Sequence, residues 1–231
     1  MRNVLNEAPS RDLHGIQAHA ARLVPADDVA GRTLLDVGCG FGWFELYALD
    51  HGVRRVIGVE PDDRQLETAR RHISDERAEF TAASATSLPL PDESVDTVVC
   101  WEVLEHLPPG SEPASFAEFR RVLRPGGALY LSTPYASVRA RVFDPAWWLV
   151  GHRHYHVDQL DRFVRDAGLP PELIETRGGG WQIVAILDLY VAKWLFRRPP
   201  FFESMVARRW DEEMRQSGGY ANCFLKARRP L

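Results

Sequence analysis

"LLDVGCGFGWFEL", residues 34–46, joins an apolar run to a helix-forming stretch through closely spaced glycines. The run ends at Asp36, and Gly38, Gly40 and Gly42 follow at every second position. Glycines between a strand and a helix usually allow a ligand to approach the backbone closely. The stretch therefore predicts a ligand site at the carboxyl end of a buried strand.

Strand and helix patterns alternate through the first 135 residues. Short apolar segments bounded by turn residues are typical of buried strands, and the segments between them are typical of helices. We expect strands at Thr33–Val37, Val56–Glu60, Glu79–Ala82, Val95–Trp101 and Ala128–Ser132. We expect helices at 12–24, Trp43–Asp50, Asp63–Ile73, 102–107 and Phe116–Leu123. This alternation predicts right-handed βαβ units and a mainly parallel sheet with helices on both faces.

The pattern changes after residue 136. A helix at Leu160–Ala167 and a sixth strand at Leu173–Thr176 precede a strongly apolar helix, Ile183–Phe196, and a polar helix, Glu203–Gln216. Residues 220–230 are expected to form a seventh strand. We therefore expect one domain over residues 1–231. Its parts are an N-terminal helical arm (1–32), a cofactor-binding core (33–136) and a helical insertion before the last strand (178–219).

Several candidate ligand-binding residues lie at or just beyond the ends of the expected strands. In open parallel sheets, ligands bind at the carboxyl ends of the strands. Asp36 with the glycines, Glu60, Ser84–Ala85 and Trp101–Glu102 would all lie along that edge. The order of the strands thus predicts one shared site for residues that are far apart in the sequence.

The glycine loop can be compared with two kinds of nucleotide cofactor site. A dinucleotide site has the spacing GxGxxG, with the pyrophosphate at the helix N-terminus. Here Trp43 stands where the third glycine would be. A carboxylate such as Asp36 is unfavourable beside a pyrophosphate and favourable beside a cation. S-adenosylmethionine carries an ammonium, a sulfonium and no phosphate, and the two oxygens of Glu60 can each accept one ribose hydroxyl.

Four segments together resemble the successive motifs of Rossmann-like (class I) S-adenosylmethionine-dependent methyltransferases. They are "LLDVGCGFGWF", "VIGVEPDD", "SATSLPLPDESVDTVVCWEVLEHL" and "FRRVLRPGGALYLSTP", in order across about residues 33 to 135. The resemblance implies an α/β fold, a Rossmann-like three-layer sandwich. Its sheet would have seven strands, mainly parallel, with the last strand antiparallel.

The resemblance also implies roles for single residues. Asp36 and the glycines would line the methionine part of S-adenosylmethionine, and Glu60 would hold the ribose. Ser84 and Ala85 match a position near the adenine where the family often has Asp-Ala, so Ser84 departs from the pattern. Trp101 would pack against the cofactor. The expected cofactor-binding residues are Asp36, Gly38, Gly40, Phe41, Gly42, Glu60, Pro61, Ser84, Ala85, Trp101 and Glu102.

Histidines are the candidate catalytic residues. Methyl transfer is an in-line displacement, so an enzyme mainly orients the reactants and excludes water, and a base is needed only for a poorly acidic acceptor. His106, His152 and His154 are the candidates. Glu102, Glu105 and His106 would share one face of a helix. Similar arrangements in quinone-type O-methyltransferases have been proposed to bind a divalent metal, but we expect a structural role here and no metal.

The apolar helix Ile183–Phe196 must bury its surface against another structure. It is too short to span a bilayer. The alternatives are the domain itself, a second copy in a homodimer, a lid over an apolar substrate, and a membrane surface. We expect the helix to fold over the site and to wall the acceptor pocket, alone or with the 137–156 segment that contains Trp147 and Trp148. Such a pocket favours an apolar or amphipathic acceptor.

Composition restricts the setting in which the protein works. A formal net charge of −4 gives no sign of a nucleic-acid partner. Cys39, Cys100 and Cys223 are odd in number and widely separated, which argues against a disulfide framework or a zinc knuckle. A reduced, cytoplasmic location is the simplest expectation. The N-terminus also shows no apolar segment typical of a signal peptide.

These observations favour a methyltransferase that uses S-adenosylmethionine and acts on a small-molecule or lipid-like acceptor. The resemblance favours oxygen as the methylated atom. One alternative is a methyltransferase-like binding protein without activity. The other is a nicotinamide-dependent oxidoreductase, which Asp36 and the glycine spacing disfavour.

Overall fold

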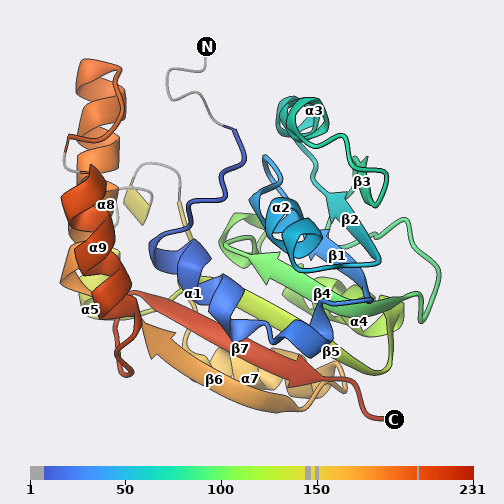
Figure 1. Ribbon diagram of the computed structural model, residues 1–231. Helices are drawn as coiled ribbons and strands as arrows, with labels where there is room; N and C mark the ends of the chain where they lie inside the picture. Colours follow the sequence, from blue (N-terminus) through green and yellow to red (C-terminus); the bar gives the residue numbers. More distant parts are fainter. Residues whose placement is uncertain (1–7, 144–146, 149–150, 202) are drawn as a thin grey trace.

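The computed structural model describes residues 8–143, 147–148, 151–201 and 203–231, and its centre is a seven-stranded sheet in the order β3-β2-β1-β4-β5-β7-β6 (Figure 1). The strands are β1 (Thr33–Val37), β2 (Arg55–Val59), β3 (Ala78–Thr81), β4 (Val95–Trp101), β5 (Leu123–Pro134), β6 (Pro171–Arg177) and β7 (Asn222–Arg228). Strands β1 to β5 pair in parallel, and β7 runs antiparallel to both β5 and β6. The expected fold, with an antiparallel last strand, is confirmed.

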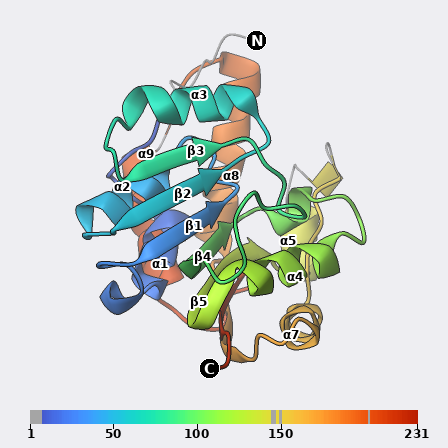
Figure 2. The same ribbon diagram turned by 90° about the vertical axis from the view of Figure 1, so that its right-hand side faces the viewer.

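Helices cover both faces of this sheet (Figure 2). They are α1 (Gly15–Leu23), α2 (Trp43–Asp50), α3 (Asp63–His72), α4 (Glu112–Val122), α5 (Val138–Phe143), α7 (Val157–Asp166), α8 (Gly180–Val191) and α9 (Glu203–Met214). Short turns of other helical types are η1 (Ala26–Asp28), η2 (Leu104–His106) and the π-helical η3 (Ala192–Phe196).

Adjacent residues of β1 belong to two hydrophobic clusters, because successive side chains of a strand point to opposite faces. Leu34 packs in one cluster with Phe44 of α2, and Leu35 packs in the other with Phe116 of α4. All of β1 is buried. A central strand covered on both faces reads as a continuous apolar run, which explains the "TLLDV" segment that begins the glycine motif.

The chain between β6 and β7 forms a helical pair. Helix α8 packs against α9, and α9 packs against α1 (Figure 1). The sequence predicted two helices here, although it placed the first at Ile183–Phe196. The structure divides that stretch, because α8 already begins at Gly180 and the chain continues as η3 after Val191.

One sequence-based expectation about local structure is wrong. Residues 102–107 do not form an α-helix, since only the short turn η2 lies there. Glu102 has a φ of 54°, in the left-handed region, which no α-helical residue adopts. Pro108 and Pro109 follow this stretch directly, and the residue before a proline is biased away from the α region. Helix α5 was not expected at all.

Candidate functional site

The glycine loop follows β1 at the carboxyl edge of the sheet. Gly38, Gly40 and Gly42 all have positive φ, at 76°, 54° and 91°. The backbone N–H groups of Gly38 and Cys39 donate to the carbonyl of Val59, at 2.8 and 3.1 Å. The loop is therefore fixed to the end of β2, where Glu60 follows.

Glu60 connects the glycine loop to the turn before α3. Its carboxylate accepts from the backbone N–H of Gly40 at 3.2 Å and from that of Asp62 at 3.1 Å. The residue is buried, whereas Pro61 beside it is exposed. Both Glu60 and Asp36 therefore lie next to the loop, as the order of the strands predicted.

Two further carboxylates near the loop are buried without hydrogen-bond partners among the described residues. They are Asp36, whose Oδ1 has none, and Glu45 of α2, of which neither oxygen has one. Burial and then the charge of Glu60 raise the pKa of Asp36 well above its usual range. Burial and the charge of Asp36 do the same for the pKa of Glu45. These carboxyl groups therefore favour their protonated form in the cofactor-free protein. A bound cation would stabilise their charged form, whereas a phosphate would destabilise it.

Sequence reasoning missed Glu45. The available signal was a single carboxylate in the first turn of an otherwise apolar helix, "WFELYALD". Its burial also depends on β2, because a Cβ added at Gly58 would lie 2.4 Å from Oε1 of Glu45. Only a glycine at that place in β2 leaves room for this carboxylate.

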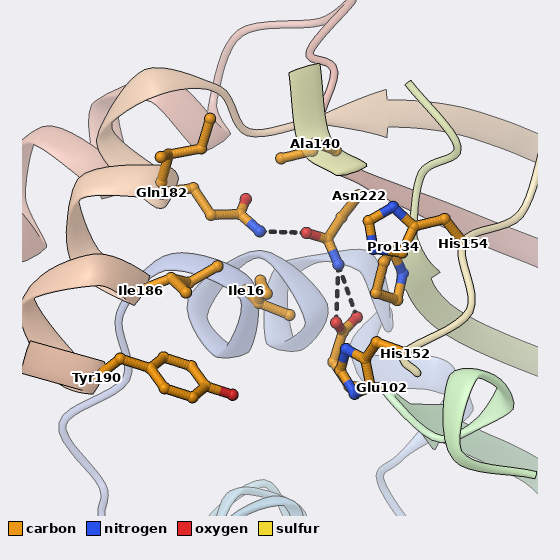
Figure 3. A pocket seen from close by; sticks show the side chains of 12 residues that line it. Ile16, Glu102, Pro134, Ala140, His152, His154, Gln182, Ile186, Tyr190 and Asn222 are labelled. Atoms are coloured by element: carbon orange, nitrogen blue, oxygen red, sulfur yellow. Dashed lines mark hydrogen bonds between the residues drawn. The ribbon is translucent and has the colours of Figure 1, made fainter. Parts of the chain in front are cut away.

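Glu102 follows β4 and forms a polar chain with the last strand. Its carboxylate accepts from Oγ of Ser132 at 2.6 Å and from Nδ2 of Asn222 at 2.9 and 2.8 Å. The side-chain amide of Gln182 in turn donates to Oδ1 of Asn222 (Figure 3). This chain ties β4, β7 and α8 together, and sequence analysis did not identify Asn222 or Gln182.

A pocket of about 170 Å³ opens beside this polar chain (Figure 3). Its walls come from α1, α5, α8, the segment before α7 and the ends of β5 and β7. The lining residues are Ile16, Glu102, Pro134, Ala140, His152, His154, Gln182, Ile183, Ile186, Tyr190, Ala221 and Asn222. Helix α8 thus lines a cavity at the carboxyl edge, and the expectation that this cavity takes the acceptor stays a prediction. Trp147 does not line it but contacts His154, with ring centroids 5.1 Å apart.

A larger pocket, of about 500 Å³, shares Ile16 and Glu102 with the first. It reaches toward the glycine loop, because Trp43 directly follows Gly42. Its remaining walls come from α1, β4, α8 and α9. The lining residues are Asp12, His14, Ile16, Gln17, Trp43, Trp101, Glu102, Ala185, Asp188, Leu189, Pro200, Val206, Ala207 and Trp210. The indole Nε1 atoms of Trp101 and Trp210 are buried with no hydrogen-bond partner among the described residues.

The predicted site residues fall into three groups. Trp101 and Glu102 line pockets, as do His152 and His154. His106 lines neither pocket, but its Nε2 lies 3.2 Å from Nε2 of His152. The His106 side chain is exposed, but partial desolvation by the surrounding residues, followed by the nearby His152, lowers its pKa.

The third group lies outside both pockets. Its members are Asp36, Gly38, Gly40, Phe41, Gly42, Glu60, Pro61, Ser84 and Ala85. Ser84 is exposed, with its hydroxyl 2.9 Å from that of Thr86, and Ala85 packs into a hydrophobic cluster. Their expected roles at a cofactor stay predictions.

Comparison with known proteins gives a consistent result. Residues 35–131 match the family model described as "Methyltransferase domain". A relative in Mycobacterium avium (strain 104), named as an uncharacterized methyltransferase, is 38% identical over 131 residues, which cover 54% of this chain and 51% of that protein. A probable S-adenosylmethionine-dependent methyltransferase of Mycolicibacterium smegmatis is 42% identical over 106 residues, covering 46% of this chain and 39% of that protein.

The match therefore spans about half the length of the curated relatives. Among solved structures, an S-adenosylmethionine-dependent methyltransferase from Mesorhizobium loti superposes with a TM-score of 0.66 and 22% identity. That likeness covers 92% of this chain and 97% of the other. It supports the fold described above over almost the whole chain.

Proposed function

We propose that the protein is a Rossmann-like class I methyltransferase, which the match of residues 35–131 to a methyltransferase-domain model supports, and that it transfers a methyl group from S-adenosylmethionine to a small amphipathic acceptor. The observation that carries this proposal is the buried Asp36 at the end of β1. Its Oδ1 has no hydrogen-bond partner among the described residues. A buried carboxylate in this condition is strongly destabilised in its charged form until a cation reaches it.

The residues around the glycine loop fit this cofactor. The left-handed Gly40 leaves open space on its Cβ side, where only the Gln65 Oε1 lies within 4 Å. Glu60 offers a carboxylate beside that backbone. The polar side chains at the loop, Asp36 and Glu60, are carboxylates. They suit a cofactor that carries an ammonium and a sulfonium, and they disfavour a dinucleotide pyrophosphate.

When bound, S-adenosylmethionine supplies a methyl group that is activated by the positive charge on its sulfur. The protein then has to hold the cofactor and the acceptor in line and to exclude water. Asp36 and Glu60 would hold polar groups of the cofactor. The aromatic rings of Trp43 and Trp101, which line the larger pocket, would cover it and keep water out.

The two pockets support an amphipathic acceptor. The apolar walls come from side chains such as Ile183 and Ile186, whereas His152 and His154 bring imidazoles to the same cavity. A neutral imidazole can accept the proton of a hydroxyl group as the new carbon–oxygen bond forms. We therefore propose an acceptor with an apolar body and a hydroxyl group, methylated at oxygen.

Calorimetric titration tests the cofactor part of the proposal. Purified protein should bind S-adenosylhomocysteine and should not bind NAD. The Glu60→Gln variant should bind S-adenosylhomocysteine more weakly by about 1.5–3 kcal/mol, the range for a hydrogen bond to a charged group. Glu79→Gln is the matched control, because it removes an exposed carboxylate from the neighbouring strand β3.

Methyl transfer itself is tested with radiolabelled S-adenosylmethionine and a panel of small phenols and hydroxylated lipids. Label should appear in at least one hydroxyl-bearing acceptor. Binding of NAD in place of S-adenosylhomocysteine would instead identify an oxidoreductase. Tight binding of S-adenosylhomocysteine without transfer to any acceptor in cell extracts would identify a binding protein.

A further inference from the structure

Three potential metal ligands converge at the edge of the smaller pocket. Glu105 and His106 lie in η2, and His152 lies in the segment before α7. One ligand atom from each, a carboxylate oxygen or a ring nitrogen, lies within 4.8 Å of the other two. The sequence separation of 46 residues between the two histidines hid this cluster from sequence analysis.

The distance between the two imidazoles suits shared coordination. Nε2 of His106 and Nε2 of His152 are 3.2 Å apart. With zinc–nitrogen bonds of about 2.0–2.1 Å, this separation corresponds to a nitrogen–metal–nitrogen angle of roughly 100°, near the tetrahedral value. The two nitrogens share a hydrogen bond in this structure, so an ion bound between them would replace its proton.

Surrounding contacts hold these ligands in place. Arg153 donates to the carbonyl of Leu104 at 2.7 Å, and the hydroxyl of Tyr155 donates to the same carbonyl at 2.9 Å. Arg153 also donates to the carbonyl of Leu107, at 2.5 Å. The residues on both sides of Glu105 and His106 are therefore fixed to the segment that carries His152. Such support matters because metal sites need ligands whose positions are set before the ion binds.

Glu105 has an outer contact of the kind found at metal sites. Its Oε2 accepts from Oγ1 of Thr133, at 3.0 Å, and the residue is buried. Carboxylates that bind metals are usually oriented by such a hydrogen bond, and its loss typically weakens metal binding 10- to 100-fold. The hydrogen bond therefore makes Thr133 a positioning residue for Glu105.

We propose that Glu105, His106 and His152 bind a divalent transition-metal ion, with zinc the best match. Two imidazoles and one carboxylate form a ligand set that binds zinc in proteins and leaves a fourth position open. Magnesium and calcium prefer oxygen ligands, so a site with two imidazoles disfavours them. Glu102 is not part of the set, because its carboxylate bonds to Ser132 and Asn222. This differs from the sequence-based expectation of no metal.

The ion would lie where it can reach the acceptor. His152 is both a ligand in the cluster and a lining residue of the smaller pocket. The open coordination position could take an acceptor oxygen and lower the pKa of its hydroxyl. With His152 bound to the ion, His154 would be the imidazole that accepts the proton. This role rests on the proposed methyl transfer, whereas the metal site itself does not.

The test measures metal binding without any cofactor or acceptor. Untagged protein is stripped with a chelator and titrated with zinc in a calorimeter, and cobalt(II) is used as a visible-light probe of the coordination. About one ion per chain should bind. His106→Ala and His152→Ala should each weaken zinc binding about 100-fold or more, and Thr133→Val about 10- to 100-fold. His106 is exposed, so its variant is expected to fold.

His154→Ala is the matched control, because His154 lies two residues from His152 and lines the same pocket. This variant should bind zinc like the unchanged protein. Zinc affinity in the His106→Ala and His152→Ala variants equal to that of the unchanged protein would overturn the site. An equally large loss of affinity in the His154→Ala control would overturn it too. Zinc binding in a chain that fails to bind S-adenosylhomocysteine would support the site while contradicting the proposed function.

Discussion

Asp36 is the residue at which stability and cofactor binding oppose each other. Its pKa is raised by burial and by Glu60, so the folded chain retains a proton that the unfolded chain releases above about pH 4. Because the native state then binds more protons than the unfolded state, the free energy of unfolding falls as the pH rises above that value. The contribution of Asp36 should therefore make the cofactor-free protein less stable at neutral pH than at mildly acidic pH.

The Asp36→Asn variant tests this conflict. At pH 7.5 it should be more stable than the unchanged protein, by about 1 kcal/mol, the size of a typical single-site effect. The difference should shrink in denaturant titrations as the pH falls through about 4, because Asp36 then becomes neutral in the unfolded state as well. Its affinity for S-adenosylhomocysteine should fall by about 1.5–3 kcal/mol. Undiminished affinity would remove Asp36 from the cofactor site.

Gly40 can be tested separately from the strain of its backbone. An alanine Cβ there would meet only Oε1 of Gln65, at 3.1 Å, whereas one at Gly38 would lie 2.2 Å from Cγ2 of Val103. A Gly38→Ala variant should therefore lose much of its stability through this overlap. Gly40→Ala should lose only the stability that left-handed strain costs, so its effect on ligand affinity can be measured. Gly52→Ala is the matched control, since Gly52 also has positive φ and nothing lies within 4 Å of its Cβ position.

The Gly40→Ala and Gly52→Ala variants should each lose about 1–2 kcal/mol of stability through left-handed strain. Only Gly40→Ala should lose affinity for S-adenosylhomocysteine, measured by calorimetry. If both variants bind the ligand normally, the loop is a turn without a ligand.

Sequence analysis put Asp36 and Glu60 beside the glycine loop, where the structure has them, because each lies near the end of an apolar strand and strand ends are a local pattern. Their roles at a cofactor stay predictions. It could not place Glu45 or Asn222 at the site. The burial of Glu45 depends on a glycine of the neighbouring strand, and Asn222 reaches Glu102 only because β7 lies next to β5. Such neighbours follow from the tertiary fold and leave no periodic signal in the sequence.

At the scale of elements, α8 is the helix whose variants can best separate acceptor binding from cofactor binding. Ile186 lines the smaller pocket, whereas no residue of α8 bonds to the glycine loop in the described part of the chain. Ile186→Arg should therefore abolish methyl transfer to an amphipathic acceptor, because a charged side chain would occupy an apolar wall. Affinity for S-adenosylhomocysteine should change less than about threefold, well under 1 kcal/mol.

Val184→Arg is the control for this substitution. Val184 lies on the same helix but is 41% exposed and lines neither pocket. The Val184→Arg variant should keep full methyl-transfer activity. Loss of activity in both variants would show that the helix, not the pocket wall, is sensitive to charge.

Elements were predicted best where the sequence pattern was long and local. The bounds of β1, α2 and β4 match the expected ones at both ends. The segment 102–107 was misassigned because apolar spacing at helical intervals also occurs in a turn, and the left-handed φ of Glu102 is set by its position at the end of β4. Helix propensity alone gives no information about such a position.

At the scale of the whole molecule, the alternation of strands and helices predicted a parallel sheet. It did not predict where the last two strands lie in that sheet. Alternation predicts parallel neighbours, and β7 instead lies between β5 and β6. The antiparallel direction came from the family resemblance. The helical pair that separates β6 from β7 in sequence therefore projects from the edge near the pockets (Figure 1).

The end of this pair exposes a cluster of apolar side chains. Trp194, Leu195 and Phe196 are 58%, 74% and 59% exposed. Lys193, Arg197 and Arg198 flank them in the sequence. No helix in the described parts of the chain is long and apolar enough to cross a membrane. Aromatic and aliphatic residues bordered by basic ones are typical of segments that lie in a membrane surface.

We expect this apolar end to bind anionic lipid, because its basic flank complements negative headgroups and because α8, which leads into it, lines a pocket that suits an amphipathic acceptor. In flotation assays the protein should bind phosphatidylserine-containing vesicles and not purely zwitterionic ones. Each basic residue near the surface contributes about 1 kcal/mol, so binding should weaken at high salt. Serine at positions 194, 195 and 196 should reduce binding at least about tenfold, whereas Val138→Ser, which removes an exposed valine on α5, should leave it unchanged.

Light scattering tests the alternative that the apolar end binds a second copy of the chain. That alternative would hold if the unchanged protein is a dimer, the triple serine variant is a monomer, and neither form binds vesicles.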